Sequence, residues 1–423
     1  MSTPTYVRPD WVRRLNALGR AAGGATVSLD PDELLDLARE STGLSDVGDE
    51  LDVESMRQRV RSIDAESNAT HIGRILARDE IVRVLQTRLR LRKAWADHPE
   101  ILDEEIVAPI FVIGPPRTGT TITLELLALD PALRAPLSWE ASHPLPLRPI
   151  TDAADRDLER SERMALGEAE HELWADIQPE LMTVHELRHD LPCECVHFMA
   201  LNFSAGYWSM QYNTPTYGLW VQDHPELLAR EYADHRKFLQ TLQWQDRQLG
   251  RTTTNWLLKT PGHLMSIPEL FAEYPDAVVV STHRDPLKWV ASAASTTTVI
   301  RWIRSDQVDP VAQGQMMSIG FRFMVEQLMG WRADGTVPDD RFVDSHFDQL
   351  MSAPAAAIRQ VYDRLGLPWP DGHDQTIADY LTHKPKGKFG KHEYTFAQYG
   401  LDAATLREEY APYVDHYDIT EET

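Results

Sequence analysis

The chain has 423 residues, 42% of them hydrophobic, and a formal net charge of −23. This length allows a large buried core, and the acidic charge, which is spread along the chain, argues against nucleic acid and other polyanions as partners. No apolar run reaches about 18 residues and the N-terminus has no apolar signal core, so we expect neither a membrane span nor a secretory signal.

The first part of the chain is predicted to be helical. The segment 30–43 begins with an aspartate, carries leucines on one face and stops at a glycine, and the segment 70–102 repeats apolar residues at helical spacing. We therefore expect a helical N-terminal region, residues 1–104, followed by a larger unit, residues 105–423.

Short apolar runs and helical segments alternate from residue 105 onward. The runs lie at 110–113, 256–258, 277–280 and 341–347, and helical segments follow them near 120–129, 262–273, 286–297 and 354–365. This alternation predicts an α/β fold with a P-loop-type parallel sheet flanked by helices. Between the first two runs lies a mostly helical, aromatic-rich insertion, about 150–250, which we expect above the strand ends as a lid on the side of the substrate.

The segment GPPRTGTT, residues 114–121, predicts an anion-binding turn between the first strand and its helix. Gly114 and Gly119 allow backbone N–H groups to face an anion, and Thr120 and Thr121 open the helix. The lysine of a nucleotide triphosphatase loop is replaced by Thr120, so a magnesium-bound triphosphate fits poorly. The loop fits a 5′-phosphate, with Arg117 as the cation.

A second candidate phosphate site follows the run at 277–280. Arg284 stands at the predicted end of that strand, and Ser292 lies eight residues further on, in the next helix. A guanidinium offers a planar fork of donors to a phosphate, and a serine hydroxyl adds another donor. Together with the loop, this pair indicates one ligand that carries two separate phosphates.

These motifs, in this order over about 108–400, resemble the sulfotransferases that use 3′-phosphoadenosine 5′-phosphosulfate (PAPS) and release adenosine 3′,5′-bisphosphate. The tyrosylprotein sulfotransferases and many bacterial members also carry arginine in the loop, as Arg117 does here. The resemblance implies a 5′-phosphosulfate site and a 3′-phosphate site. The residues it assigns to the donor are Pro116, Arg117, Thr118, Gly119, Thr120, Thr121, Arg284 and Ser292.

The same resemblance implies a lysine beside the transferred sulfonate and a basic loop near the C-terminus. WLLKTPGHL places the lysine at Lys259. KPKGKFGKHEYTF is similar to the loop that closes over the 3′-phosphate, with Lys388 as the expected contact and Lys386 and Lys391 beside it. The function implied is transfer of a sulfonate to a hydroxyl, or less often an amine, of a small acceptor. The aromatic insertion favours an apolar or aromatic acceptor.

The acceptor must lose a proton, so a base is expected near the loop. Glu140 lies 23 residues after Arg117, on the second strand or the loop that leaves it, and the resemblance makes it the first candidate. His143 is the second, because an imidazole titrates near neutral pH. His263 is the third, since related cytosolic enzymes carry a histidine just after their Lys-Thr pair.

Three other interpretations remain open from the sequence. A P-loop small-molecule kinase would share the architecture but lacks its lysine here, and a non-catalytic nucleotide-binding protein could keep the same loop. HELRH, residues 185–189, matches the H-E-x-x-H zinc protease pattern, but Pro192 would end the helix and the phosphate motifs would stay unexplained.

The cysteines give the last expectation. Cys193 and Cys195 are the only two, and the single residue between them makes a disulfide sterically poor and a metal site weak. We expect reduced thiols, a cytoplasmic enzyme and no bound metal.

Overall fold

A five-stranded parallel sheet lies at the centre of the structure, a computed structural model that describes residues 6–23, 26–184, 186, 188–252, 255–384 and 392–422. The strand order is β2-β3-β1-β4-β5, and every neighbouring pair is parallel. The strands are β1 (Ile110–Ile113), β2 (Leu133–Arg134), β3 (Asn255–Lys259), β4 (Val278–His283) and β5 (Phe342–His346). The predicted α/β fold class is confirmed.

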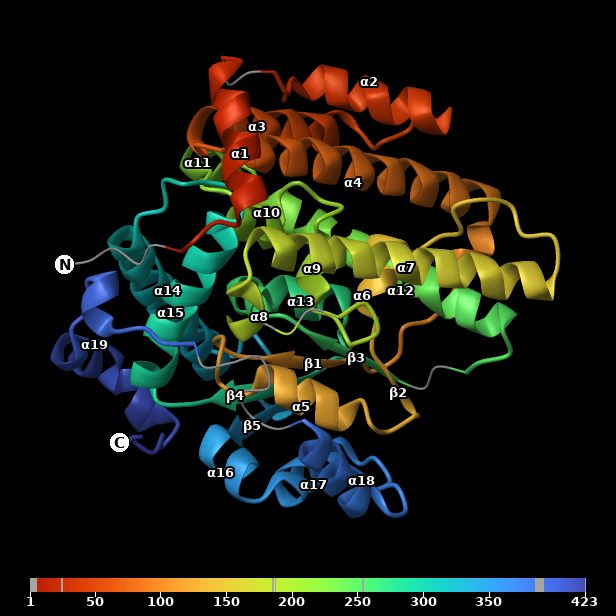
Figure 1. The fold of residues 1–423 in the computed structure, drawn as a ribbon. Coiled ribbons are helices and arrows are strands. Elements are labelled where there is room, and N and C mark those ends of the chain that lie inside the picture. Colours follow the sequence, from red (N-terminus) through yellow and green to blue (C-terminus); the bar gives the residue numbers. More distant parts are fainter. Residues whose placement is uncertain are drawn as a thin grey trace.

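The two faces of the sheet are covered by different helices because side chains alternate along each strand. Phe111 and Ile113 of β1 face a core shared with the insertion, whereas Ile110 and Val112 face a second core. Helices of the first core are α9 (Cys195–Met199), α12 (Glu226–Gln248), η2 (Pro261–Met265) and α13 (Ile267–Glu273). Those of the second are α5 (Thr120–Leu127), α16 (Phe347–Ser352), α17 (Pro354–Leu365) and α18 (His373–His383). Figure 1 shows these groups on opposite sides of the sheet.

The rest of the insertion and the C-terminal part are also helical. The remaining insertion helices are α7 (Ala153–Ile177), α8 (Leu181–Val184), α10 (Gly206–Gln211) and α11 (Pro215–Gln222), and α6 (Ser138–Ser142) precedes them. The others are α14 (Pro286–Trp302), α15 (Pro310–Ala333), η3 (Asp339–Arg341), η4 (Phe396–Tyr399) and α19 (Ala403–His416). None of the described helices is both long and apolar enough to cross a membrane.

Four helices precede the sheet and pack on the insertion (Figure 1). They are α1 (Asp10–Ala21), α2 (Pro31–Thr42), α3 (Glu50–Glu66) and α4 (His71–Asp97), and the short η1 (Pro99–Ile101) follows. As the sequence predicts, α2 is capped by Asp30 and ends at Gly43, which is left-handed at φ 68°.

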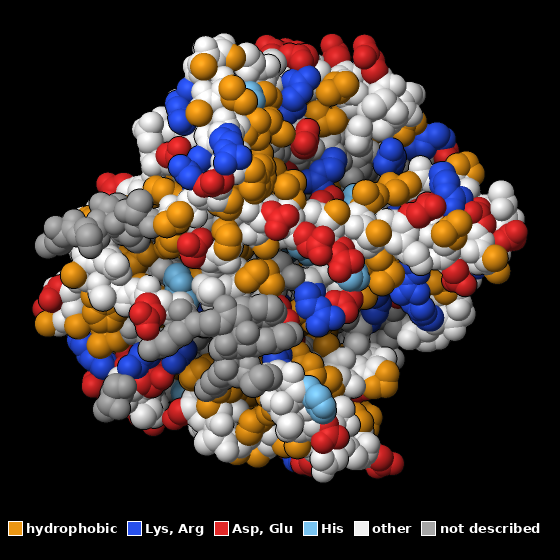
Figure 2. All heavy atoms as spheres, viewed as in Figure 1, with side chains coloured by type: hydrophobic (Ala, Val, Ile, Leu, Met, Phe, Trp, Pro, Cys, Tyr) orange, Lys and Arg blue, Asp and Glu red, His pale blue; other side chains and the backbone are white. Residues whose placement is uncertain are grey.

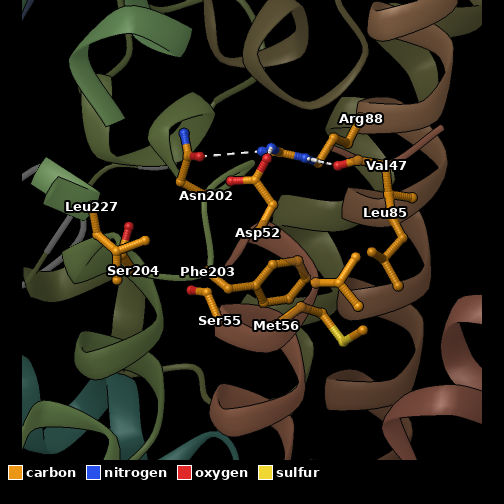
Figure 3. A pocket seen from close by; sticks show the side chains of 11 residues that line it. Val47, Asp52, Ser55, Met56, Leu85, Arg88, Asn202, Phe203, Ser204 and Leu227 are labelled. Carbon is orange, nitrogen blue, oxygen red and sulfur yellow. Dashed lines mark hydrogen bonds and ion pairs between the residues drawn. The ribbon is translucent and has the colours of Figure 1, made fainter. Parts of the chain in front are cut away.

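Arg88 of α4 joins the N-terminal helices to the insertion (Figure 3). Its buried guanidinium pairs with Asp52 of α3 at 2.7 Å and Asp234 of α12 at 3.2 Å. It also donates to the carbonyl oxygens of Val47 and Leu201. One cation therefore holds three segments that are far apart in the sequence.

Acidic and basic side chains are interspersed on the face of the molecule in Figure 2. Many of them form ion pairs, and the net charge of −23 is the excess of acidic over basic side chains that remains. Pairs of this kind on the surface contribute little to stability, whereas the buried Arg88 has a larger effect.

Replacing Arg88 with methionine is expected to lower the free energy of unfolding by about 3 kcal/mol, because two half-buried carboxylates lose their buried partner and the Val47 and Leu201 carbonyl oxygens lose a donor. Urea denaturation measures this change. The control is Arg57→Met, which removes a partly exposed pair with Asp32 (2.7 Å) and should cost about 0–1 kcal/mol. Equal losses in the two variants would contradict the role of Arg88.

Candidate functional site

The turn after β1 is a preformed loop that leads directly into α5. Gly119 has φ 98° and Arg117 has φ 71°, both in the left-handed region, and a Cβ on Gly119 would lie 3.1 Å from the Phe347 side chain. The Thr118 hydroxyl bonds the carbonyl oxygen of Pro115 at 2.7 Å and the Thr282 hydroxyl at 2.6 Å. Thr282 belongs to β4, so the loop is fixed to the neighbouring strand.

The N-terminus of α5 is open to an anion. No side chain among the described residues caps this helix, so its first N–H groups keep their capacity to bind. Thr120 is buried, whereas Thr121 and Arg117 are exposed. A helix N-terminus with adjoining hydroxyls and a guanidinium is a suitable site for a phosphate.

Lys259 lies at the carboxyl end of β3, next to this loop. Its side chain is buried, and Nζ lies 3.1 Å from the Thr121 hydroxyl and 2.5 Å from a carboxylate oxygen of Glu194. The Thr260 hydroxyl donates to the other oxygen of Glu194 at 3.2 Å. Glu194 lies between the two cysteines and belongs to none of the motifs that the sequence shows.

Arg284 follows β4 and lies against the loop from the other side. Its Nη1 donates to the backbone oxygen of Arg117 at 2.9 Å, and its guanidinium stacks 3.8 Å from the centre of the Phe347 ring. Glu422 accepts from Nε and Nη2 at 2.6 and 2.9 Å. Ser292 is buried on α14. The structure thus brings Arg284 beside the loop, as expected. It also pairs the guanidinium of Arg284 with the side-chain carboxylate of Glu422.

Glu140 lies on the short helix α6, and not on a strand or strand-leaving loop as expected. Its two oxygens accept from Arg134 at 2.6 and 3.0 Å, and one of them also accepts from the Leu137 N–H at 2.8 Å. Arg134 in turn donates to Asp246 at 2.9 Å. The helix forms here because Glu140 caps its first turn. This buried carboxylate has a fixed orientation.

His143 ends α6 and pairs with an acid on α7. Its Nε2 lies 3.0 Å from Glu170, which also pairs with Arg83. Burial alone would raise the pKa of Glu170, but the hydrogen bond from His143 and the charge of Arg83 lower it to about 2. Nε2 of His143 therefore serves a carboxylate and is not available to another group in this arrangement.

His263 lies in the core and has no open face toward the loop. Its Nδ1 is 2.7 Å from the Tyr232 hydroxyl, and burial lowers its pKa to about 3. It does not have the exposure that the sequence-based role as a base needs.

The H-E-x-x-H match does not form one helical face in the described residues. Helix α8 ends at Val184, and residues 186 and 188–190 are not helical. Glu186 instead pairs with Lys384 at 3.3 Å. His185, Lys386, Lys388 and Lys391 lie outside the described residues, so the expected contact of Lys388 with a 3′-phosphate stays a prediction.

Two cavities in the part of the chain that the structure describes lie away from the loop. One, of about 120 Å³, lies between the end of α14 and α10 and is lined by Tyr212, Arg301 and Arg304 among others. The other is the small hollow around Arg88 (Figure 3). The carboxyl edge of the sheet, with Lys259, the loop and Arg284, therefore remains the candidate site on chemistry.

Comparison with known proteins gives a family match that spans the sheet. A family model described as "Sulfotransferase family" matches residues 109–371. That range includes β1 to β5, the loop, Lys259 and Arg284. No curated protein matches the chain.

Two solved structures resemble nearly the whole chain. One is the sulfotransferase STF9 from Mycobacterium avium, with 27% identity and a TM-score of 0.78 over 92% of this chain and 97% of that one. The other is the sulfotransferase STF1 from Mycobacterium tuberculosis H37Rv, with 26% identity and a TM-score of 0.74 over 90% and 98%. The similarity therefore includes the N-terminal helices.

The Glu170 pair has a pH signature. A carboxylate with pKa 4.5 when unfolded and about 2 when folded stabilises the native state by on the order of 3 kcal/mol above pH 4.5. This contribution falls as the pH drops from about 4.5 toward 2. Glu170→Gln should lose it, so the stability difference from the wild type, measured by urea denaturation, should shrink on acidification. The exposed Glu172→Gln is the control, and a pH-independent difference for Glu170→Gln would contradict the pairing.

Proposed function

Because this chain belongs to the sulfotransferase family, we propose that its sulfonate donor is PAPS and that its acceptor is a small apolar or aromatic molecule with a hydroxyl or amine. The observation that carries the proposal is the edge formed by β3, β1 and β4. Lys259, the loop and Arg284 follow these three adjacent strands, and each contacts the next. Ligands of open parallel sheets bind at such an edge.

The residues of this edge fit a donor with two phosphates. The open N-terminus of α5 with Thr120 and Thr121 would hold the 5′ end, and Arg284 and Ser292 would hold the 3′-phosphate. Thr120 in place of the P-loop lysine makes the kinase alternative less suitable, since that lysine binds the β- and γ-phosphates of a triphosphate. The donor supplies an activated sulfonate with a nucleotide phosphate as its leaving group.

Two cations would stabilise the charge that develops during transfer. Lys259 is buried at the end of β3, where a low dielectric strengthens its interactions, and Arg117 lies exposed at the tip of the loop. Glu194 and Thr121 fix the position of the Lys259 ammonium. We assign Glu194 as the positioning residue for Lys259. Its carboxylate accepts hydrogen bonds from both the Lys259 ammonium and the Thr260 hydroxyl, which fixes the place of the ammonium.

Glu140 is proposed, on the family resemblance, to accept the proton of the acceptor. Arg134 and the Leu137 N–H hold its carboxylate in one orientation, and Oε1, which accepts from Arg134, keeps a second lone pair for that proton. His143 is the weaker choice, since Glu170 occupies its Nε2.

The acceptor class rests on the composition of the insertion. Seven of its aromatic side chains are core residues: Phe198, Phe203, Trp208, Tyr212, Tyr217, Tyr232 and Phe238. Four others are half-buried: Trp174, Tyr207, Trp220 and Trp244. An apolar or aromatic alcohol suits these surfaces better than a sulfated polysaccharide, which the acidic chain would repel.

The proposal predicts that adenosine 3′,5′-bisphosphate raises the melting temperature and that ATP with magnesium does not. A ligand at 100 times its dissociation constant adds roughly 2.7 kcal/mol of stability, which thermal denaturation detects.

In a transfer assay with PAPS and phenolic alcohols, Glu140→Gln should lower kcat by about 10²–10⁴-fold and keep bisphosphate binding. Stabilisation by ATP–magnesium alone would favour a kinase, and full turnover by Glu140→Gln would remove its role as base.

Glu422 and a 3′-phosphate would compete for Arg284. Glu422→Gln removes the competing charge and should tighten bisphosphate binding by about 2- to 5-fold, as a partly exposed ion pair is worth roughly 0.2–1 kcal/mol. Calorimetric titration measures the affinity. Glu421→Gln changes the net charge equally but affects a carboxylate that pairs with Arg407 at 3.5 Å, so it should bind as the wild type does. Equal tightening in the two variants would indicate a general charge effect.

A further inference from the structure

Three potential metal ligands converge in the core behind Lys259. They are Cys195 at the start of α9, His235 in α12 and His263 in η2, and all three are buried. The Cys195 sulfur and one ring nitrogen of each histidine all lie within 4.8 Å of one another. Thiolate and imidazole are the ligands that zinc and other borderline transition metals prefer.

Both histidines have a ring nitrogen without a partner. Nε2 of His235 and Nε2 of His263 are buried and make no hydrogen bond. The other nitrogen, Nδ1, is 2.7 Å from a tyrosine hydroxyl in each case, Tyr274 for His235 and Tyr232 for His263. Nε2 is therefore the nitrogen of each ring that is free to bind a metal. A buried polar atom without a partner costs about 1–3 kcal/mol, so two of them in one place indicate a missing ligand.

Tyr232 also favours the tautomer of His263 that a metal needs. The Tyr232 hydroxyl lies 3.2 Å from the Ser266 hydroxyl, so it can donate to Ser266 while it accepts from Nδ1–H of His263. This tautomer leaves the lone pair of Nε2 for a metal.

We propose that Cys195, His235 and His263 bind one zinc ion. Around a tetrahedral zinc the ligand atoms are about 3.3–3.6 Å apart, from Zn–S and Zn–N bonds of about 2.3 and 2.0–2.1 Å, so the side chains need to close by about 1 Å. Binding forms one Zn–S and two Zn–N bonds and releases the Cys195 thiol proton to solvent. Water takes the fourth position. The thiolate leaves the zinc centre with one net positive charge, and the carboxylate of the neighbouring Glu194 is already paired with Lys259.

Such a site would stabilise the two segments that carry Glu194 and Lys259 in the proposed active site. Cys195 directly follows Glu194, and His263 follows the Lys259–Thr260 pair in the same connection. Zinc would fix the distance between these two segments, which Glu194 and Lys259 join in front. This inference goes beyond the proposed function and does not depend on the identity of the donor or acceptor.

The test is the metal content of the whole chain. The protein is purified without chelator, and its metals are measured by inductively coupled plasma mass spectrometry. We expect about one zinc per chain in the wild type and in Cys193→Ser, and a loss of most of it in Cys195→Ser and His235→Gln. Cys193 is the matched control because it is equally buried, two residues away and outside the cluster.

A second measurement, on the wild-type protein, tests the site even if the variants fail to fold. Wild-type protein is unfolded in chelator and refolded with cobalt(II), and thiolate-to-cobalt charge-transfer bands are expected in the absorption spectrum. The bands should persist in Cys193→Ser. Refolding with zinc should also raise the melting temperature above that of the metal-free protein. A wild-type chain that carries no zinc or other metal and gives no cobalt bands on refolding would overturn the proposal, as would zinc retained by Cys195→Ser.

Discussion

The buried ammonium of Lys259 is the constraint on which the candidate site depends. A charge in the interior requires a partner, and Glu194 supplies it from a segment that β3 would otherwise not contact. Thr121 and Thr260 complete the bonds, so α5, β3 and the segment before α9 meet at one atom. Removing Glu194 would therefore disturb the geometry of the loop as well as the charge of Lys259.

The sheet converts this local contact into a site with two ends. β1 lies between β3 and β4, and the register of the parallel ladders places Lys259 and the loop at the same edge as Arg284. The Thr118–Thr282 bond then ties the loop to β4. The loop cannot move relative to Arg284 without breaking a buried hydroxyl pair, so the separation of the two proposed phosphate sites is set before any ligand binds.

Much of this edge was predictable because its residues follow strand-like runs, and parallel strands end at a common edge. The loop and Arg284 were identified on that basis, whereas Lys259 was expected only from the resemblance of WLLKTPGHL to a sulfotransferase segment. Glu194 and Glu422 were not, since they lie 65 and 138 residues from their partners and belong to no strand or turn pattern. The helix around Glu140 was missed because β2 is only two residues long and leaves no apolar run. Cys195, His235 and His263 could not be grouped from the sequence either, because the two histidines lie in separate helices and share no motif.

Both buried or partly buried cations of the site are paired with carboxylates in the structure, Lys259 with Glu194 and Arg284 with Glu422. The two pairs differ in a way that bears on function. Glu194 is anchored by Thr260 and precedes a core helix, so it cannot leave without a rearrangement. The Glu422 side chain is more exposed, 28% against 19% for Glu194, and its partner Arg284 is less buried than Lys259, so an arriving phosphate can displace it at lower cost. The structure thus pairs a fixed carboxylate with the cation proposed for transfer and a displaceable one with the cation proposed for donor binding.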